Sequence, residues 1–538
     1  MRLITVENMR ELERLAFESG LSYEKMMQNA GMGLAEIIHS KFGWIDNKAI
    51  VGLVGSGNNG GDALVALNWL LVHGWKCSAL LVKERLNDPL VAQFISLGGE
   101  LTPTAVLGNA KKIQTILEDN AIILDGVIGT GINLSLREEV AQFLASIKAH
   151  LRGQIVVAVD CPSGIDCDTG EAAPEVLPAR LTVCMEAVKT GLLKLPAFSL
   201  CGQIVVTSIG VPGRLAAKKS ENFVIDNRWV AEHLPVRKAD GHKKYFGTVV
   251  VVGGSTNYLG APLFAGTGAY RAGAGLVTLA VPRIVQLTTA VNLPECTWFL
   301  LDDENGVISE DAATLVLEPM KTASCLVVGP GIGREETTRR FLSRWLLQQE
   351  TGKKNSSFGF VPKTESNSKL LATFPPIVMD ADGLRWLAEQ PNWTENKNLR
   401  LVVTPHVGEM AALTGLAPEE IQANRERVAS EFAQKWKQVV VLKGALTVVA
   451  APTGQIAIVP VANSALAKAG SGDALSGIIA AFIAQGLPLF EAACAGAWIH
   501  ARAGEKVAEA QGNEFSLLVR EILNMIPEVF AELNKITA

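Results

Sequence analysis

The sequence predicts an α/β fold built on open parallel sheets and divided into two domains. Short uninterrupted apolar runs such as Ala49–Val54, Ile155–Val159 and Cys325–Val328 are typical of strands buried on both faces. Each run is followed by a turn rich in glycine or aspartate, and helical patterns alternate with the strands, which favours parallel sheets. At 538 residues the chain is also too long for a single hydrophobic core.

Composition and charge narrow the class of protein. Apolar residues make up 48% of the chain and charged residues 19%, as in well-packed globular proteins. A net charge of −5 without a basic block argues against nucleic acid as a partner. No signal peptide or membrane span is expected, because the start lacks an apolar segment and Gln485, Gly486 and Pro488 interrupt the longest apolar run. Eight scattered cysteines without a CxxC pair argue against a zinc or redox site and favour the reducing cytoplasm.

The first domain begins with two predicted helices, residues 7–18 and 23–40, which carry apolar residues at helical spacing. The strand at 49–54 then leads into GSGNNGGD, residues 55–62, and a helix is predicted over 63–73. A strand, a Gly-rich turn and a helix in succession form the geometry that holds phosphate or a nucleotide on backbone amides. The alternative is an ordinary turn whose glycines serve packing.

Polar residues also follow the later strands of this domain. Strands are predicted over residues 76–82, 121–124, 155–159, 180–185 and 204–209. The carboxyl ends of parallel strands meet at one edge of a sheet, so the side chains that follow them can converge there. The side chains in question are those of Asn58, Asn59, Asp125, Asp160 and Ser163. A lone aspartate at a strand end is often only a turn former, which is the alternative for each.

A polar linker over residues 211–222 precedes a second α/β domain. Strands are predicted there over residues 247–252, 325–328, 377–379, 401–404 and 439–442, with a hairpin over 447–461. The last four of these strands end in the turns GPGIG, DADGL, PHVGE and KGALT, which again places ligand-type residues at one sheet edge. Residues 348–369 are polar and irregular, and we expect an exposed loop insertion.

The stretch KAGSGDALSG, residues 468–477, is the strongest chemical signal of the second domain. Glycines before a helix let backbone N–H groups converge on an anion, and the helix N-terminus adds partial positive charge. Asp473 beside such an anion suits the general base of a phosphoryl transfer. An aspartate that merely caps the helix is the alternative. Lys443 and His406 are candidates for phosphate and substrate contacts, although such residues are often solvated or structural.

Together these motifs resemble the bifunctional NAD(P)H-hydrate repair enzymes over nearly the whole chain. The motifs are GSGNNGGD, DGVIGTG, AVDCPSGID, GAPLFAGTGAYRAGAGLV, GPGIG, TPHVGEM, KGALT and AGSGDALSGIIAAF. The resemblance implies two three-layer αβα domains: a Rossmann-like epimerase over residues 1–215 and a ribokinase-like, ADP- or ATP-dependent dehydratase over 223–538. The chain departs from the usual motifs by small or apolar exchanges at Ala63, Gly126, Val127, Ile128, Ala474 and Ser476.

The resemblance also implies roles for individual residues. Those that would contact the hydrated cofactor in the first domain are Asn58, Asn59, Gly60, Gly61, Asp62, Gly129, Thr130, Gly131 and Asp160. A potassium ion (K⁺) would be held by Asn59, Asp125 and Ser163. In the second domain the hydrate would contact Ala261, Gly333, His406 and Asp473, and the adenine nucleotide would contact Lys443, Gly444, Ala445, Leu446, Thr447 and Gly472. Mg²⁺ is expected with the nucleotide, and a homo-oligomer is expected in the cytoplasm.

The implied chemistry follows from the poor leaving ability of hydroxide. Phosphorylating the C6 hydroxyl of a hydrated nicotinamide turns it into phosphate, which the ring nitrogen can expel. Asp473 would take the hydroxyl proton while the amides of residues 470–472 bind the phosphoryl oxygens. For inversion of the same carbon in the first domain, we expect Asp160 to handle protons, with Lys189 as a partner.

Two alternatives remain at this point. A ribokinase-like small-molecule kinase would share the GSGD chemistry but release a stable phosphate ester, and it would not need the NNGGD domain. A non-catalytic protein that binds a nucleotide-like ligand would not need Asp125, Asp160 and Asp473. The sequence does not choose between ADP and ATP, or between the hydrates of NADH and NADPH.

Overall fold

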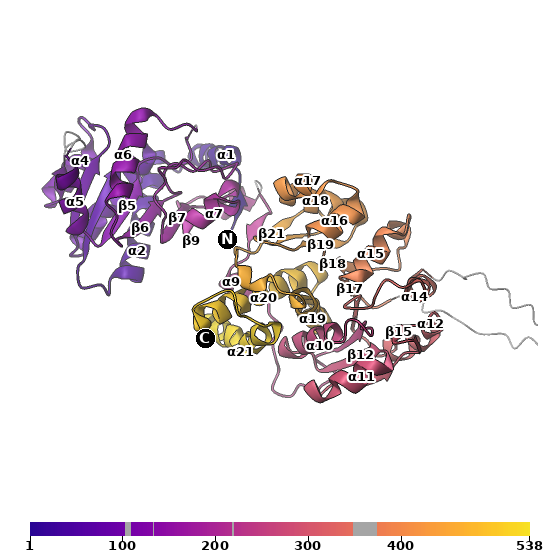
Figure 1. Cartoon of the computed structure of the whole chain (residues 1–538). Helices are drawn as coiled ribbons and strands as arrows, with labels where there is room; N and C mark the ends of the chain where they lie inside the picture. The colour runs from indigo at the N-terminus through magenta and orange to yellow at the C-terminus, as the bar shows by residue number, and fades with distance from the viewer. Residues whose placement is uncertain (103–108, 133, 218–219, 348–373, 538) are drawn as a thin grey trace, which may run out of the picture. The chain divides into compact units, whose positions relative to one another are not determined.

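The computed structural model describes residues 1–102, 109–132, 134–217, 220–347 and 374–537, which form two compact units, Met1–Val224 and Ile225–Ala538 (Figure 1). Residues 348–369, for which we expected an exposed loop, lie outside the described residues. All eight cysteines are free and buried, as a reducing compartment would require. A search of the described helices finds none that is long and apolar enough to cross a membrane.

The first unit is built on a parallel sheet in the order β4-β3-β2-β5-β6-β7-β9. Its strands are β1 (Leu3–Ile4), β2 (Ala49–Val54), β3 (Lys76–Leu81), β4 (Glu100–Thr102), β5 (Ile122–Gly126), β6 (Ile155–Val159), β7 (Leu181–Met185), β8 (Val188–Lys189), β9 (Gln203–Thr207) and β10 (Phe223–Val224). Its helices are α1 (Val6–Glu18), α2 (Tyr23–Phe42), α3 (Asn58–Val72), α4 (Pro89–Ser96), α5 (Ala110–Glu118), α6 (Glu138–Ala149), α7 (Ala197–Cys201) and α8 (Gly213–Ala217), with a 3₁₀ turn at Thr190–Leu193. In chain order the sheet reads 3-2-1-4-5-6-7, the Rossmann arrangement, so ligands are expected where β2 and β5 diverge.

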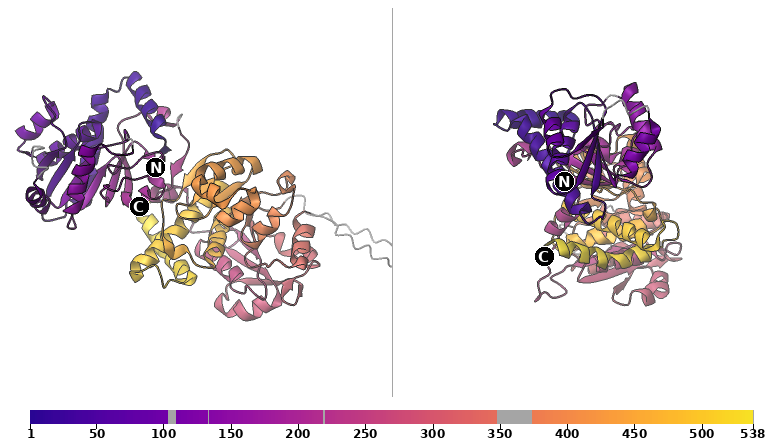
Figure 2. Two further views of the ribbon diagram at one scale, coloured as in Figure 1. Left: turned by 45° about the horizontal axis from the view of Figure 1, so that its top comes forward. Right: turned by 90° about the vertical axis from the view of Figure 1, so that its left-hand side faces the viewer.

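Two hydrophobic cores cover the two faces of this sheet. Ile50 and Val54 of β2 join the core formed with α1 to α4, whereas Val51 and Leu53 join the core formed with α5 and α6. Alternate residues of a strand face opposite sides of a sheet, so this division makes three layers. The right-hand view of Figure 2 shows the strands of this unit between helices on either side.

The second unit repeats the arrangement, with the sheet order β21-β20-β19-β18-β17-β16-β11-β12-β13. Its strands are β11 (Thr248–Val252), β12 (Leu276–Val281), β13 (Thr297–Leu300), β14 (Asp303–Glu304), β15 (Val307–Ile308), β16 (Cys325–Val328), β17 (Ile377–Met379), β18 (Leu401–Val403), β19 (Val439–Leu442), β20 (Val448–Ala450) and β21 (Ile456–Ile458). Its helices are α9 (Asn227–His233), α10 (Ala261–Arg271), α11 (Arg283–Thr289), α12 (Ala312–Leu315), α13 (Leu317–Met320), α14 (Glu336–Leu346), α15 (Asp382–Ala388), α16 (Val407–Thr414), α17 (Pro418–Ala423), α18 (Arg425–Trp436), α19 (Ser471–Ala484), α20 (Leu489–Gln511) and α21 (Val519–Thr537). The seven strands from β19 to β13 in this sheet order are parallel. Numbered by their order in the chain and read from β13, they again run 3-2-1-4-5-6-7, and β20 and β21 extend the sheet antiparallel. The prediction of two α/β domains with three layers is confirmed.

Helices α10 and α19 approach each other unusually closely because glycines lie at their contact. A Cβ atom on Gly477 would lie 1.8 Å from the carbonyl oxygen of Ala265, and one on Gly268 would lie 2.5 Å from that of Ala474. Only a residue without a side chain fits at such distances. This packing fixes the first turn of α19, which carries Asp473, against the second half of α10 at Gly268.

Several element boundaries differ from those predicted. Helix α3 begins at Asn58 and not at residue 63, so NNGGD forms the first helical turns and not a turn before the helix. Helix α19 likewise begins at Ser471 and not at residue 474. The segment at 211–222, predicted as a linker, contains the short helix α8. The prediction did not include β12 and β13.

The close approach of α10 and α19 predicts a large cost for adding one methyl group. Gly477→Ala should destabilise the chain by about 1–3 kcal/mol or more, because the carbonyl of Ala265 is backbone and cannot move aside easily. Gly213→Ala is the control, since a Cβ there meets no atom within 4 Å. Urea unfolding of both variants and wild type measures the difference. Equal stability of the two variants would show that the helices can separate freely.

Candidate active sites

Asp125 and Ser163 meet at the sheet edge of the first unit. Asp125 ends strand β5, is fully buried, and accepts hydrogen bonds from the Ser163 hydroxyl at 2.6 Å and from the Ser163 backbone N–H at 2.8 Å. Burial raises the pKa of Asp125, and the hydrogen bonds from Ser163 only partly oppose this. No Lys or Arg side chain of the described residues forms an ion pair with this carboxylate. The site is therefore suited to a bound cation.

Asn59 lies in the first turn of α3 beside this pair. Its side-chain Nδ2 donates to the backbone carbonyl of Val159 at 2.9 Å, which orients the amide. A Cβ on Gly129 would lie 3.0 Å from Asn59 Oδ1, so the loop after β5 passes directly over this oxygen. The first turn of α3, the end of β5 and the turn after β6 thus supply Asn59, Asp125 and Ser163. Asn58, in contrast, is exposed to solvent. Oxygen donors of this kind bind hard cations.

The NNGGD glycines also serve packing. A Cβ on Gly60 would lie 2.1 Å from the carbonyl oxygen of Gly55, and one on Gly61 would lie 2.7 Å from the sulfur of Met27. These glycines therefore do have the packing role that was the alternative interpretation of GSGNNGGD. It exists alongside the buried Asn59 and Asp62, whose polar side chains packing does not explain. Thr130 and Gly131 of the loop after β5 are solvent-accessible, as a ligand contact requires.

A second cluster in this unit contains Asp160, Lys189 and Asp62. The Lys189 side chain is buried and donates to Asp160 Oδ1 and, at 3.1 Å, to the carbonyl of Met185. Burial alone would lower the pKa of Lys189, but the charge of Asp160 keeps it above its ordinary value. Burial, together with the charges of Asp160 and Glu13, raises the pKa of Asp62 well above its ordinary range. One lysine therefore faces several carboxyl groups, and the neutral form of Asp62 is favoured relative to an exposed aspartate.

The corresponding cluster of the second unit centres on Asp380 and Lys443. Asp380 directly follows β17, and Lys443 directly follows β19. Lys443 Nζ donates to Asp380 Oδ1 at 2.7 Å, and the Ser476 hydroxyl donates to Asp380 Oδ2 at 2.6 Å. Burial would raise the pKa of Asp380, but Lys443 and these hydrogen bonds hold it below its ordinary value. A Cβ on Gly472 would lie 3.1 Å from Lys443 Nζ, so this glycine leaves the lysine accessible from α19.

Asp473 lies in the first turn of α19 without capping it. The cap residue is Gly470, in the left-handed conformation at φ 91°, and no side chain accepts a hydrogen bond from the helix N-terminus. Burial, together with the charge of Asp380, raises the pKa of Asp473 to about 7, although Lys443 opposes this. The structure therefore rejects the capping alternative for Asp473. A carboxyl group with a pKa near neutrality is suited to accept a proton.

His406 has a structural role. It is the cap residue of α16, and its Nδ1 accepts hydrogen bonds from the backbone N–H groups of Gly408 at 3.0 Å and Glu409 at 3.2 Å. The Glu409 side chain accepts in return from the His406 backbone N–H at 2.9 Å. Burial, followed by the charges of Lys443 and Arg385, lowers the pKa of His406. The imidazole is neutral near pH 7, and its half-exposed Nε2 lies 3.4 Å from Glu409 Oε1.

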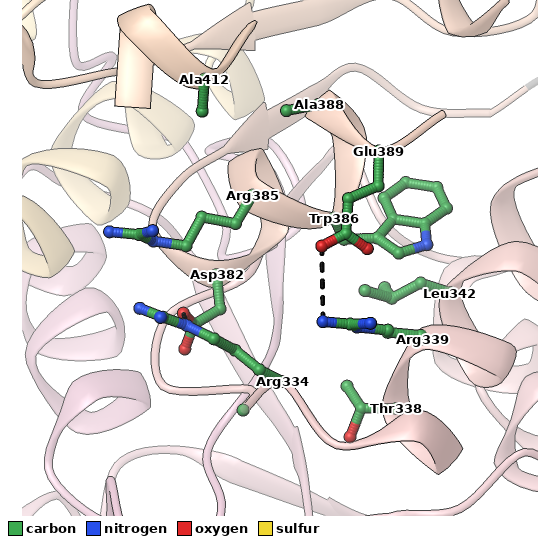
Figure 3. A pocket seen from close by; sticks show the side chains of 11 residues that line it. Arg334, Thr338, Arg339, Leu342, Asp382, Arg385, Trp386, Ala388, Glu389 and Ala412 are labelled. Carbon is green, nitrogen blue, oxygen red and sulfur yellow. Dashed lines mark hydrogen bonds and ion pairs between the residues drawn. The ribbon is translucent and has the colours of Figure 1, made fainter. Parts of the chain in front are cut away.

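The other expected contacts of the second unit surround this cluster. The segment from Lys443 to Thr447 forms the turn between β19 and β20, where the Thr447 hydroxyl donates to the Gly444 carbonyl at 2.9 Å. Ala445 is exposed, whereas Leu446 is buried and does not present its side chain to a ligand. Ala261 begins α10, and Gly333 lines a cavity beside α14 and α15 (Figure 3).

The sequence analysis missed three polar residues of these clusters. Asp380 was placed after a strand but given no role, although it is the ion-pair partner of Lys443. Ser476 was noted only as a departure from a motif, and Glu13 was read only as part of a helix. The sequence did contain a signal for Glu13. It lies four residues after Met9 and three before Ala16, so helical spacing places its carboxylate on the same face of α1 as these two buried residues. Asp380 gave no local signal, because its partner is 63 residues away.

Comparison with known proteins gives two family models and many full-length relatives. Residues 249–528 match the model described as NAD(P)H-hydrate dehydratase, and residues 23–191 match the model described as YjeF-related protein N-terminus. A bifunctional NAD(P)H-hydrate repair enzyme of Moorella thermoacetica is 35% identical over 99% of this chain and 98% of its own length. That of Coxiella burnetii is 32% identical over 95% and 96%. A solved ADP/ATP-dependent NAD(P)H-hydrate dehydratase from Bacillus subtilis, co-crystallized with ATP/Mg²⁺, is 27% identical over 58% of this chain and 99% of its own, with a TM-score of 0.48.

The raised pKa of Asp473 predicts how stability depends on pH. The folded chain holds a proton on Asp473 up to about pH 7, whereas the unfolded chain releases it near pH 3.8. The stability that this proton contributes is complete below about pH 4 and is lost as the pH rises through about 7. Asp473→Asn cannot ionise, so near pH 8 it should exceed wild type in stability by roughly 1–4 kcal/mol, and the gain should shrink toward pH 4. Urea unfolding across this range measures the gain, and a gain independent of pH would contradict the assignment.

Proposed function

The chain belongs to the family of bifunctional NAD(P)H-hydrate repair enzymes, and we propose that the Asp473 cluster carries the dehydration and the Asp160–Lys189 cluster the epimerisation. The enzyme interconverts the R and S hydrates of NADH or NADPH at C6 of the nicotinamide ring. It also dehydrates the S hydrate in a nucleotide-dependent reaction that restores the reduced cofactor and releases phosphate. The observation that carries the assignment is the Asp473 carboxyl, which has a pKa of about 7 at a helix N-terminus beside Lys443.

In the dehydration, Asp473 accepts the proton of the C6 hydroxyl as that oxygen attacks the terminal phosphorus of ADP or ATP. The ring nitrogen then expels the new phosphate group from C6, and loss of a proton from the neighbouring ring carbon restores the dihydronicotinamide. A base with a pKa near 7 can both accept the proton and release it again at neutral pH. The half-exposed ring of His406 contacts the hydrate, with Ala261 and Gly333 as further contacts.

The adenine nucleotide binds, in this proposal, along Lys443, Gly444, Ala445 and Thr447, with its phosphates at Gly472. Lys443 carries a positive charge that burial alone would suppress and that Asp380 and Glu409 maintain, because their charges raise its pKa. The first backbone N–H groups of α19 have no acceptor within the helix, so they can bind phosphoryl oxygens. Mg²⁺ is expected with the nucleotide, since it neutralises charge that develops on a transferring phosphoryl group.

For the epimerisation, Asp160 handles the proton and is held in place by its ion pair with Lys189. Asp62, whose pKa burial raises, is suited to donate a hydrogen bond or a proton to an oxygen of the hydrate. Inversion at one carbon requires groups that act on both of its faces, and the cluster supplies two carboxyl groups. The NNGGD segment and residues 129–131 are the further contacts to the substrate.

Potassium fits the Asn59, Asp125 and Ser163 site. Asp125 is a fully buried carboxylate without a cationic side chain to balance it, and Ser163 and Asn59 add neutral oxygens. A monovalent cation bound there would neutralise Asp125 and orient oxygens of the substrate. Zinc or iron would call for His or Cys ligands, and the described residues contain no cluster of three or more His, Cys, Asp or Glu arranged to hold a metal.

A ribokinase-like small-molecule kinase was the nearest alternative function. It is no longer favoured, because bifunctional repair enzymes match the chain over both units. The boundaries 1–215 and 223–538 remain our proposal for the two catalytic domains. We also propose that the protein is a homo-oligomer and that it resides in the cytoplasm. The free thiols of all eight cysteines favour a reducing compartment such as the cytoplasm. Leu34 and Ile38, which could have belonged to a subunit interface, are part of the core of the first unit.

The role of Asp473 predicts a selective loss of one activity. Asp473→Asn should lower the rate of nucleotide-dependent dehydration of S-NADH hydrate by about 100- to 10,000-fold, the usual contribution of a general base. Recovery of the absorbance of the reduced nicotinamide measures this rate. Interconversion of R and S hydrates, followed by chromatography, should stay at the wild-type rate. Dehydration at the wild-type rate would refute Asp473 as the base.

The first unit predicts the reverse separation. Asp160→Ala should abolish epimerisation while S-hydrate dehydration continues, because the two clusters share no residue. Removing Asp160 also leaves Lys189 buried without its partner, which costs about 3–5 kcal/mol. The double variant Asp160→Ala with Lys189→Met removes both charges and serves as the folding control. Epimerisation that survives in the double variant would exclude this pair from the reaction.

A further inference from the structure

A cavity of about 330 Å³ lies at the carboxyl end of β16, between α14 and α15 of the second unit. Its lining includes Gly333, Arg334, Arg339, Asp382, Arg385 and Trp386 (Figure 3). Cavities of this size hold part of a drug-sized ligand. Three guanidinium groups around one small cavity, against two carboxylates, indicate an anionic occupant.

Arg385 is the cavity's guanidinium that forms no ion pair among the described residues, and Glu409 is the carboxyl group whose pKa its charge lowers. Arg334 forms an ion pair with Asp382 at 2.7 Å, and Arg339 forms one with Glu389 at 3.4 Å. Within the described part of the chain, Arg385 donates no hydrogen bond and forms no ion pair. Its side chain is half-buried, and Figure 3 shows it extended in the same direction as Arg334, with Asp382 between them. Guanidinium groups arranged in this way are suited to bind a phosphate group through paired hydrogen bonds.

The cavity borders the cluster around Asp473. The charge of Arg385 acts, after burial and Lys443, to lower the pKa of His406, and the charge of Asp382 contributes to the raised pKa of Asp473. Both effects require these groups to lie near one another, because charge interactions decay over about 10 Å. A ligand that extends from Asp473 into the cavity therefore passes Arg385.

The cavity is also separate from the turn expected to hold the adenine nucleotide. The cavity lies after β16 and the turn lies after β19, with β17 and β18 between them in the sheet. Three strand spacings of about 4.8 Å place the two roughly 14 Å apart. Asp380 and Asp473 lie between, at the end of β17 and the start of α19. Two ligands can thus approach the reacting hydroxyl from opposite sides.

We propose that Arg385, supported by Arg334, binds a phosphate group of the hydrated dinucleotide, whose remote end occupies this cavity. The inference rests on the proposed function, since it takes the hydrate to be the substrate at Asp473. The hydrate carries a pyrophosphate and, in the NADPH form, also a ribose 2′-phosphate. Both present the oxygens that a guanidinium binds in pairs. Asp382 orients Arg334 and leaves Arg385 as the positive charge that the substrate neutralises.

The test measures KM for three ligands in wild type and Arg385→Gln. We expect KM for the S hydrates to rise roughly 10- to 100-fold, as on loss of a hydrogen-bonded charge, with kcat and the KM for ADP within about twofold of wild type. A rise for both hydrates assigns the pyrophosphate, and a rise for NADPH hydrate alone assigns the 2′-phosphate. Unchanged KM values for both hydrates, or a rise confined to ADP, would overturn the proposal.

Two further variants and a binding measurement serve as controls. Arg385→Lys keeps the charge without the paired donors, and we expect an intermediate KM. Arg340→Gln removes an exposed arginine of α14 that does not line the cavity, and KM should not change. Binding of unhydrated NADPH and NADH, measured by calorimetry, should weaken in Arg385→Gln even if the hydrate proved not to be turned over. Failure of turnover in wild type would count against the proposed function, whereas unchanged NADPH and NADH binding in Arg385→Gln would count against the proposed role of Arg385.

Discussion

A lysine paired with an aspartate at the carboxyl end of a parallel sheet underlies both candidate active sites. Lys189 pairs with Asp160 in the first unit, and Lys443 pairs with Asp380 in the second. Burying one such charge alone costs several kcal/mol, so each pair holds two strand ends or turns in a fixed relation. The central strands such as β2, β16 and β19 are apolar and buried on both faces, which leaves their ends as the place where polar chemistry can be built.

Each pair stands beside a further carboxyl group for which no second cation is supplied. In the first unit this group is Asp62, and in the second it is Asp473. The pKa of this further carboxyl is raised, because burial and the charge of the neighbouring aspartate outweigh the opposing charge of the lysine. Both extra carboxyls are carried by the first turns of a helix that follows a Gly-rich segment. The two units thus share one electrostatic arrangement.

The sequence predicted the strands well because buried parallel strands are continuous apolar runs, as in Ala49–Val54 and Val439–Leu442. It misplaced the starts of α3 and α19, because glycine and asparagine usually mark turns and here begin helices that pack too closely for side chains. The capping role of His406 was readable, since Glu409 follows it three residues later, as in a capping box. The Asp380–Lys443 pair and the unpaired Arg385 were not readable, because both depend on which strand ends and helices become neighbours in space.

The position of Asp473 shows which electrostatic effect dominates. A carboxylate in the first turn of a helix is ordinarily stabilised by about 0.3–1 kcal/mol through the helix dipole, which would lower its pKa. Its pKa instead rises from 3.8 to about 7, which corresponds to roughly 4 kcal/mol in the opposite direction. Burial, together with the charge of Asp380, therefore outweighs both the dipole and Lys443. A residue that only stabilised the helix would not be kept at such a cost, whereas a base that must release its proton near pH 7 needs this balance.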